Sequence, residues 1–317
     1  MASCLCVFVA NLLLPHEADA QQWPQRPVRI IVGFAAGGNT DSIARLSAEW
    51  LRPRLDQNVL VENRPGANGA IGAEAVMRAA PDGYTLLMGA LPQLGILPAM
   101  TKTPYDPVTD FTPITVVGAN DFALAVNDRL PVRALPELVA HVKARPGEIA
   151  YASGGSGTVA HLTTALFLQR AGLTMVHIPY RGGALALADL LSGQVPLYFG
   201  NLAEVLPHAA TLKILAVSGT RRAAALPAVP TIAEQGYPGF HTATWNGLVA
   251  PAATPRDIVE RLAAAMRPAA QDAAFVAKLA RIGVDPVGNT PEEFAALLKA
   301  DLVTWAEAVR ISGAKVD

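Results

Sequence analysis

Two glycine-rich turns, each lying between a run of β-forming residues and an amphipathic helical stretch, constrain the fold of this chain most. The first, Ala35–Asp41, follows the apolar run Val28–Phe34, and the second, Ser153–Thr158, follows Ile149–Ala152. A helix N-terminus presents unpaired N–H groups and a partial positive charge, so each turn predicts a place for an anion. Because the two turns lie far apart in the chain, they predict two lobes that bind one small anionic molecule between them.

Short apolar strands alternate with helical patterns along nearly the whole chain, which predicts an α/β protein with largely parallel sheets. A chain of 317 residues, 51% of them apolar, is long enough for about two domains. The strand pattern leaves the first lobe near residue 120 and returns near residue 242. We therefore expect a discontinuous first lobe, 21–121 plus 242–317, and an inserted second lobe, 122–241. Two domains joined end to end near residue 120 are the alternative on patterning alone.

Several local patterns give more detailed expectations. The stretches Ile114–Val117 and Phe122–Val126 predict two separate strands, and three helices are expected to close the chain. Thr254 and Thr290 each precede a proline, which predicts two helix starts with threonine N-caps. A glutamate three residues after Thr290, and another three after Thr231, predict capping boxes at both places.

The N-terminal segment 1–20 has the pattern of a signal peptide. The apolar run Leu5–Leu14 is too short to span a bilayer, and Ala18-Asp19-Ala20 fits a cleavage site before Gln21. No Lys or Arg precedes the apolar run, so a disordered cytosolic leader is the alternative. The only cysteines, Cys4 and Cys6, lie in this segment. A processed chain would therefore have no thiol for metal binding, catalysis or disulfides.

Charge and motifs argue against several function classes. A net charge of −1 disfavours nucleic acid and membrane surfaces as partners. A nucleotide-binding P-loop requires a Gly-Lys pair, and the sequence has none. Gly155–Ala160 matches the glycine pattern of a dinucleotide-binding motif, but the acidic residue that this motif requires further along the chain is absent. The histidines lack metal-ligand spacing, so we expect no metal and no cofactor. Ser156, His161 and Asp189 could form a catalytic triad. The enzymatic alternative is therefore a secreted α/β hydrolase with Ser153 or Ser156 as its nucleophile.

Polar groups at the predicted strand ends give the candidate site, because ligands of open α/β sheets lie beyond the carboxyl ends of the strands. Asp41 could touch the ligand or only cap its helix, and Arg181 could pair with a carboxylate or only brace the lobes. The candidate ligand-binding residues are Phe34, Gly37, Gly38, Asn39, Thr40, Asp41, Ser153, Ser156, Gly157, Thr158, His161, Arg181, Gly182, Asn201 and Thr244.

A series of motifs in fixed order, from Trp23 to the C-terminus, resembles the extracytoplasmic solute receptors of tripartite tricarboxylate transporters, the Bug family. These motifs are Pro27–Val32 with Gly37–Asp41, Val61–Gly69, Ala80–Leu87, Tyr105–Pro107, Tyr151–Thr158, Pro179–Gly183 and Pro227–Thr231.

The resemblance implies a periplasmic, two-lobed binding protein of the Venus flytrap, type II-like fold, with a hinge of two crossing strands. It implies no enzymatic activity, no cofactor, and a small carboxylate ligand (a di- or tricarboxylate, an amino acid or an aromatic acid) that is delivered to membrane permease subunits. A monomer suits such a receptor, and a role as the ligand input of a membrane sensor is the alternative. The resemblance also implies that the Gly37–Asp41 turn binds one carboxylate, partly through water, and that the Ser153–Thr158 turn contacts the ligand from the other lobe.

The segment Gly89–Leu94 departs from the family pattern, because many relatives carry small polar residues there. Leu91 and Pro92 would make that wall of the site less polar. The sequence therefore favours an aromatic or longer aliphatic acid over a citrate-like ligand.

Overall fold

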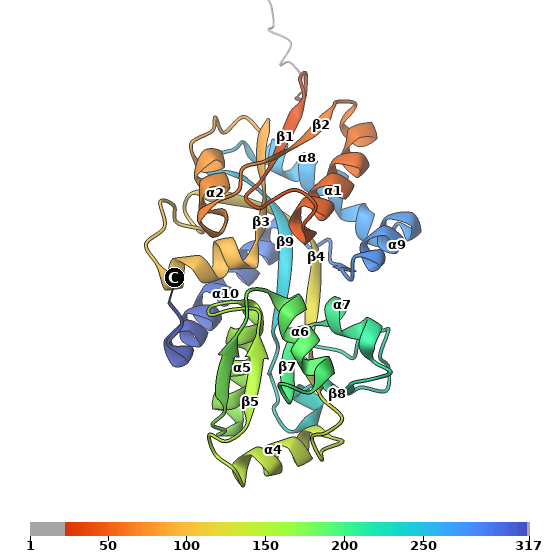
Figure 1. Cartoon of the computed structure of the whole chain (residues 1–317). Helices are drawn as coiled ribbons and strands as arrows, with labels where there is room; N and C mark the ends of the chain where they lie inside the picture. Colours follow the sequence, from red (N-terminus) through yellow and green to blue (C-terminus); the bar gives the residue numbers. More distant parts are fainter. Residues whose placement is uncertain (1–22, 316–317) are drawn as a thin grey trace, which may run out of the picture.

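The structure, a computed structural model, describes residues 23–315 and consists of two α/β halves joined by long strands (Figure 1). The signal peptide predicted at 1–20 lies outside the described residues. One strand path, β2-β1-β3-β9-β4-β7-β5-β6, runs through both halves, and β8 and β10 pair with β4 off this path. The shared strand is β4 (Phe111–Val126). None of the helices between residues 23 and 315 is both long enough and apolar enough to cross a membrane.

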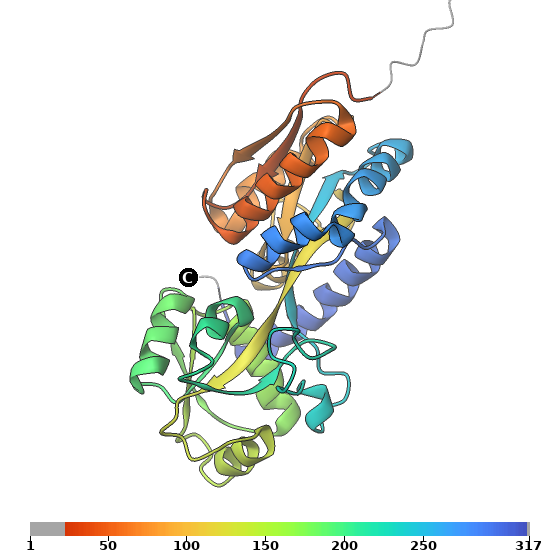
Figure 2. The same ribbon diagram turned by 90° about the vertical axis from the view of Figure 1, so that its right-hand side faces the viewer.

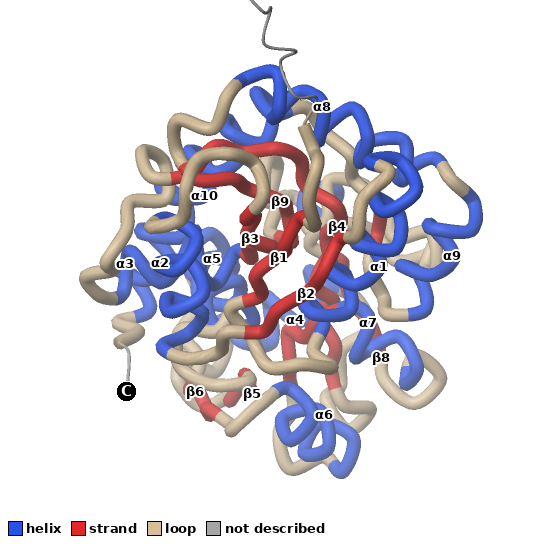
Figure 3. Tube along the Cα trace, turned by 90° about the horizontal axis from the view of Figure 1, so that it is seen from above, coloured by secondary structure: helices blue, strands red, loops and turns tan. Residues whose placement is uncertain are grey.

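The first half contains the sheet β2-β1-β3-β9 and the N-terminal part of β4. Helices cover both of its faces, as the view from above shows (Figure 3). Successive residues of β1 point to opposite faces, so Ile30 belongs to the apolar cluster that includes side chains of α1, α8 and α9, whereas Ile31 belongs to the cluster on the side of α2 and α10. The elements of this half are β1 (Val28–Val32), α1 (Asn39–Leu55), β2 (Val59–Asn63), α2 (Ala70–Met77), β3 (Thr85–Ala90), α3 (Leu97–Met100), β9 (Ala243–Pro251), α8 (Arg256–Met266), α9 (Ala273–Arg281), β10 (Asp285–Pro286) and α10 (Pro291–Ser312).

The second half is built on the C-terminal part of β4. Its strands β5 and β6 are parallel, as are β5 and β7, while β7 and β8 run antiparallel to β4. The last helix of the chain, α10, contacts α5 of this half. The elements of the second half are α4 (Leu135–Lys143), β5 (Ala150–Ser153), α5 (Val159–Ala171), β6 (Val176–Pro179), α6 (Gly183–Ser192), β7 (Leu197–Asn201), α7 (Leu202–Val205) and β8 (Lys213–Val217).

The expectation of largely parallel sheets was wrong, because the strands at the centre of the molecule pair antiparallel. The strand β9 runs antiparallel to both β3 and β4. The expectation of two strands between residues 114 and 126 was also wrong. Gly118 and Asn120 are residue types that favour turns, but both stay paired with β9. The pairing of β4 with β9 shifts register twice, and β4 continues as one strand.

The strand β4 changes partners where the two halves meet. Its residues up to Asp121 pair with β9, and from Phe122 onward they pair with β7. Figure 2 shows this strand, in yellow, running from one half into the other. Ser218, which is fully buried, connects β4 to the segment that leads into β9. Its Oγ accepts the N–H of Phe122 and donates to the carbonyl of Thr242.

Two of the three predicted threonine caps are present. The side chains of Thr290 and Glu293 form a reciprocal capping box at the start of α10, and Thr231 and Glu234 form another. The predicted N-cap at Thr254 was wrong. Its hydroxyl donates to the carbonyl of Pro251, and α8 begins one residue later than a threonine cap would require.

Candidate ligand-binding cleft

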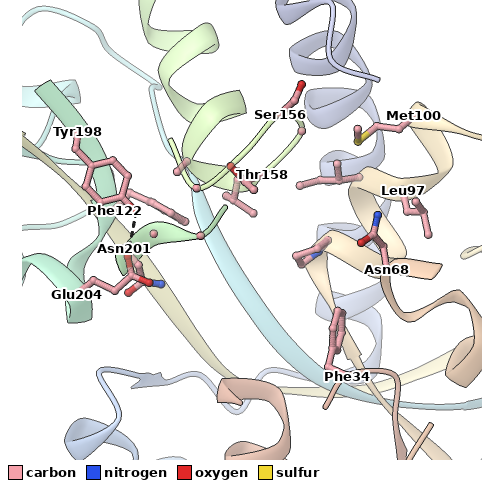
Figure 4. Close-up of a pocket in the computed structure, with 18 residues that line it drawn as sticks. Phe34, Asn68, Leu97, Met100, Phe122, Ser156, Thr158, Tyr198, Asn201 and Glu204 are labelled. Atoms are coloured by element: carbon pink, nitrogen blue, oxygen red, sulfur yellow. Dashed lines mark hydrogen bonds between the residues drawn. The ribbon is translucent and has the colours of Figure 1, made fainter. Parts of the chain in front are cut away.

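A cleft of about 400 Å³ lies between the two halves (Figure 4). One wall comes from the first half and carries Phe34, Asn68, Leu97 and Met100. The other wall comes from the second half and is formed by the turn before α5, the start of α6, and side chains of β4, β7 and α7. The remaining lining residues are Pro92, Ile96, Phe122, Gly154, Ser156, Gly157, Thr158, Val159, Ala160, Gly182, Gly183, Tyr198, Asn201 and Glu204.

The turn Ser153–Thr158 brings a helix N-terminus to the cleft. Thr158 is the N-cap of α5, and its hydroxyl accepts the N–H of His161. The N–H groups of Val159 and Ala160 precede the first helical hydrogen bond, so they have no partner inside the helix. Both residues line the cleft. Gly157 has a φ of +75°, which strains any residue other than glycine, and a Cβ there would displace the end of the Met100 side chain on the opposite wall.

Two stacked histidines, His161 buried and His177 half-buried, support this turn from below. The rings of His161 and His177 lie 3.8 Å apart and are nearly parallel. His161, 4% exposed, accepts the N–H of Gly157 at Nδ1 (3.1 Å), while Nε2 of His177 lies 2.7 Å from Oγ of Ser153. Burial, with a smaller contribution from His177, lowers the pKa of His161 to about 4. The ring is therefore neutral at pH 7, as an Nδ1 that accepts a hydrogen bond requires.

The turn before α1 is held by a buried carboxylate. Asp41, 2% exposed, accepts the N–H of Gly37 at 2.8 Å, the guanidinium of Arg45 at 2.9 Å and the amide of Asn63 at 2.9 Å. Burial opposes the charged form, but these hydrogen bonds outweigh it and hold the pKa of Asp41 below its usual value. Both oxygens of Asp41 are thus used within the protein, and the N-cap of α1 is Gly38. Asp41 braces the turn.

Two helix N-termini supply positive polarity to the cleft. These belong to α5 and α6, which are 13 and 10 residues long. Among the described residues that line the cleft, there is no Lys or Arg, and the one acid, Glu204, accepts a hydrogen bond from the hydroxyl of Tyr198. Much of the opposite wall is apolar. The cleft therefore suits a molecule with a small anionic group and an apolar part.

Six of the residues predicted for the site line this cleft: Phe34, Ser156, Gly157, Thr158, Gly182 and Asn201. A smaller hollow of about 290 Å³ is lined by Gly37 and Asn39 together with Asn120, and it shares Asn201 and Glu204 with the cleft. The side-chain amide of Asn39 donates to Asn120 at 3.3 Å, so the turn before α1 contacts β4, the strand that joins the two halves.

The other predicted residues lie outside both lining sets. Ser153, Asp41 and His161 are buried behind the turns, Gly38 and Thr40 begin α1, and Thr244 lies on β9 opposite Asn120. Arg181 is exposed on the loop before α6. Leu91 is fully buried in the core, so the less polar wall comes from Pro92 and the helical turns that follow it.

The triad drawn from the sequence does not assemble. Nδ1 of His161 accepts from Gly157, and Asp189 accepts a hydrogen bond from the hydroxyl of Tyr180 at 2.7 Å. Neither side chain is hydrogen bonded to Ser156 in the described part of the chain.

Sequence reasoning missed Asn68 and the side chains of Leu97, Met100, Tyr198 and Glu204. A usable signal existed for Asn68 only. It lies between two glycines with positive φ in the turn that joins β2 to α2, which repeats the strand–turn–helix pattern of the two predicted turns.

Two α/β halves, a continuous strand shared by their sheets and a cleft between them define a two-lobed solute-binding protein. The chain belongs to the tripartite tricarboxylate transporter receptor family, known as TctC or Bug, whose members are solute-binding receptors and not enzymes. The family profile, described as "Tripartite tricarboxylate transporter family receptor", matches residues 43–313. BugT of Bordetella pertussis is 38% identical over 314 residues, which span 98% of this chain and 96% of BugT.

Solved structures of the family have the same periplasmic binding protein fold. Rpa4515 of R. palustris with adipate is 34% identical, covers 93% of this chain and 100% of its own, and has a TM-score of 0.75. MatC of Rhodopseudomonas palustris with bound malate is 31% identical, with coverages of 90% and 100% and a TM-score of 0.71. A TctC solute-binding protein from Polaromonas without ligand is also 31% identical, with coverages of 91% and 99% and a TM-score of 0.84.

Proposed function

We propose that this receptor captures a small organic carboxylate in the cleft and delivers it to the membrane subunits of a tripartite transporter. The observation that carries the proposal is the meeting of two helix N-termini at a cleft whose described lining has no Lys or Arg. Backbone N–H groups at such termini recognise a carboxylate without a full positive charge. Two relatives were solved with dicarboxylates, adipate and malate, which supports the same ligand class here.

The ligand that fits best is a dicarboxylate with an apolar middle. One carboxylate would accept hydrogen bonds from the start of α5 and from Asn201. Its methylene groups would then lie against Phe34, Leu97 and Met100. Each charge-assisted hydrogen bond contributes about 1.5–3 kcal/mol and each helix terminus up to about 2 kcal/mol. After the costs of ordering and closure, a few of them suffice for micromolar affinity, which corresponds to about 8 kcal/mol.

Ligand binding is proposed to close two lobes, 21–121 plus 242–317 and 122–241, around a hinge at β4 and the segment entering β9. The TM-score is higher with the unliganded Polaromonas receptor than with the adipate and malate complexes. This difference supports an open arrangement of the halves here. Closure follows if the ligand binds the closed arrangement more tightly. Small-angle scattering with and without ligand should then give a smaller radius of gyration in its presence.

We also propose that the receptor works as a monomer in the periplasm after the segment 1–20 is removed. Expression of the full chain in a Gram-negative host and mass spectrometry of the exported protein should give an N-terminus at Gln21. Recovery of the uncleaved chain from the cytosol would contradict this location.

The substitution Asn201→Asp tests the carboxylate site. Oδ1 of Asn201 caps α7 by accepting the N–H of Ala203 at 3.0 Å, and an aspartate keeps that acceptor. The new negative charge faces the cleft, where at a few ångströms it costs a bound carboxylate about 1–3 kcal/mol. Calorimetric titration with a series from malate to adipate should therefore show binding that is weaker by about fivefold or more.

The matched control is Asn58→Asp, because the side chain of Asn58 is exposed and lies outside the cleft. It introduces the same charge and should leave the affinity unchanged. Equal affinity in N201D and the wild-type protein would refute the proposed site.

A further inference from the structure

A second cavity, of about 540 Å³, lies behind the hinge, and we call it the rear cavity. Ala119 and Asp121 of β4 are paired with Trp245 and Ala243 of β9, and all four line it. Residues paired directly across two antiparallel strands share a face, and neighbours along a strand point to opposite faces. Phe122 lines the cleft, so the rear cavity lies on the opposite face of the hinge strands.

Both halves of the molecule contribute to the rear cavity. The segment 220–242, which follows β8 in the second half, forms one side, and β10 and α10 of the first half form the other. None of the charged groups of the rear cavity lines the cleft or the smaller hollow beside it.

Carboxylates dominate the charged lining. Asp121, Asp285 and Asp301 line the cavity, against one guanidinium, Arg221. His241 also lines it. The carboxylate of Asp121 has no hydrogen bond or ion pair within residues 23–315, and it lies against the backbone of Gly219. Burial, with Asp285 adding and Arg221 opposing, raises the pKa of Asp121 to about 6. Burial likewise raises the pKa of Asp301 to about 6, so both groups gain from a nearby cation.

One buried polar group of the lining lacks a partner. Oγ1 of Thr242, 2% exposed, makes no hydrogen bond in the described structure. The indole N–H groups of Trp245 and Trp305 instead face Asp301: Nε1 of Trp245 donates to it at 2.6 Å, and Trp305 also lowers its pKa. Leaving a buried hydroxyl unpaired is costly, which indicates that a molecule in the cavity satisfies it. The hydroxyl of Thr242 can donate to an oxygen of that molecule, and the carboxylates favour a positive charge.

We propose that the rear cavity binds a small organic ammonium ion that also carries a hydrogen-bond-accepting oxygen, of the amino alcohol class. The ammonium group donates to Asp121 and Asp301, and the oxygen accepts from the hydroxyl of Thr242. This ligand is distinct in charge and location from the carboxylate of the front cleft, so the two proposals stand or fall separately.

Titration of the full receptor with ethanolammonium chloride tests this site, with tryptophan fluorescence as readout because Trp245 and Trp305 line the cavity. Ionic strength is held constant with KCl. The expected result is a saturable change with ethanolammonium, weaker binding of ethylammonium, which lacks the oxygen, and no response to ethylene glycol, which lacks the charge. The same response to KCl alone, or equal responses to all three compounds, would overturn the proposal.

Paired variants locate the site. The double variant D121N/D301N keeps side-chain acceptors but removes two charges, and it should weaken ethanolammonium binding about tenfold or more. The control D257N removes an exposed carboxylate of α8 and should bind as the wild type does. N201D should also keep full ethanolammonium affinity. If the double variant does not fold, D121N alone replaces it. Unchanged affinity in the carboxylate variant that folds would rule out this cavity.

Discussion

The stacked histidines beneath the second turn should make the receptor sensitive to mild acid. Burial lowers the pKa of His161 to about 4 in the folded state, whereas an unfolded histidine titrates near 6.5. As the pH falls below about 6.5, the unfolded chain binds a proton that the folded chain does not. The contribution of His161 to the free energy of unfolding is therefore fully present above that pH, and it is lost progressively as the pH falls towards the folded pKa.

The two pKa values fix the magnitude. Between about pH 7 and pH 5, His161 alone should lower the free energy of unfolding by about 2 kcal/mol. The pKa of His177 is lowered by burial too, which adds to the loss. Asp121 and Asp301, with raised pKa values, act in the opposite direction. A variant that removes only the titration of His161 is needed to isolate its part.

His161→Asn is that variant, because the asparagine Oδ1 occupies nearly the place of Nδ1 and can still accept the N–H of Gly157. Urea unfolding at both pH values should show a smaller loss of stability in H161N than in the wild type, by about 2 kcal/mol. His208→Asn removes a histidine outside the stack and is the control. The reasoning fails if H161N and the wild type lose the same stability between the two pH values.

Two further substitutions have effects that follow from local geometry. Thr290→Ala removes the side chain that accepts the N–H of Glu293 in the capping box of α10, so urea unfolding should show a loss of about 1 kcal/mol; no change would mean that the box is not formed in solution. Gly157→Ala places a Cβ against Met100 at a φ of +75°, so calorimetric titration with a dicarboxylate should show weaker binding as the turn shifts, and wild-type affinity would contradict the positive-φ geometry of this turn.

The sequence predicted the elements well where one local signal determined them. The apolar, β-branched run at Val28–Val32 and the capping residues of α10 act through neighbours in the chain. It failed where a distant partner decided the outcome. Nothing local distinguishes the Gly118–Asp121 stretch from a turn, because its strand conformation depends on pairing with β9.

The same distinction applies to the cleft. Ser156, Thr158 and Gly182 could be found because a helix start after a strand is visible in the sequence. Met100 and Tyr198 could not, because their places in the walls follow from how the two halves pack. Asp41 was found, but its place behind the turn depends on Asn63, which approaches from a neighbouring strand.

The unbroken strand β4 has a consequence for how the receptor unfolds. One apolar cluster includes Leu87 of the first sheet and Leu124 and Phe199 of the second, so the interior is continuous through the hinge. The two halves, which we propose close on the ligand, are therefore not two cooperative units. Heat should melt the molecule in a single transition, and a stabilising substitution anywhere in that interior should raise the melting temperature of the whole.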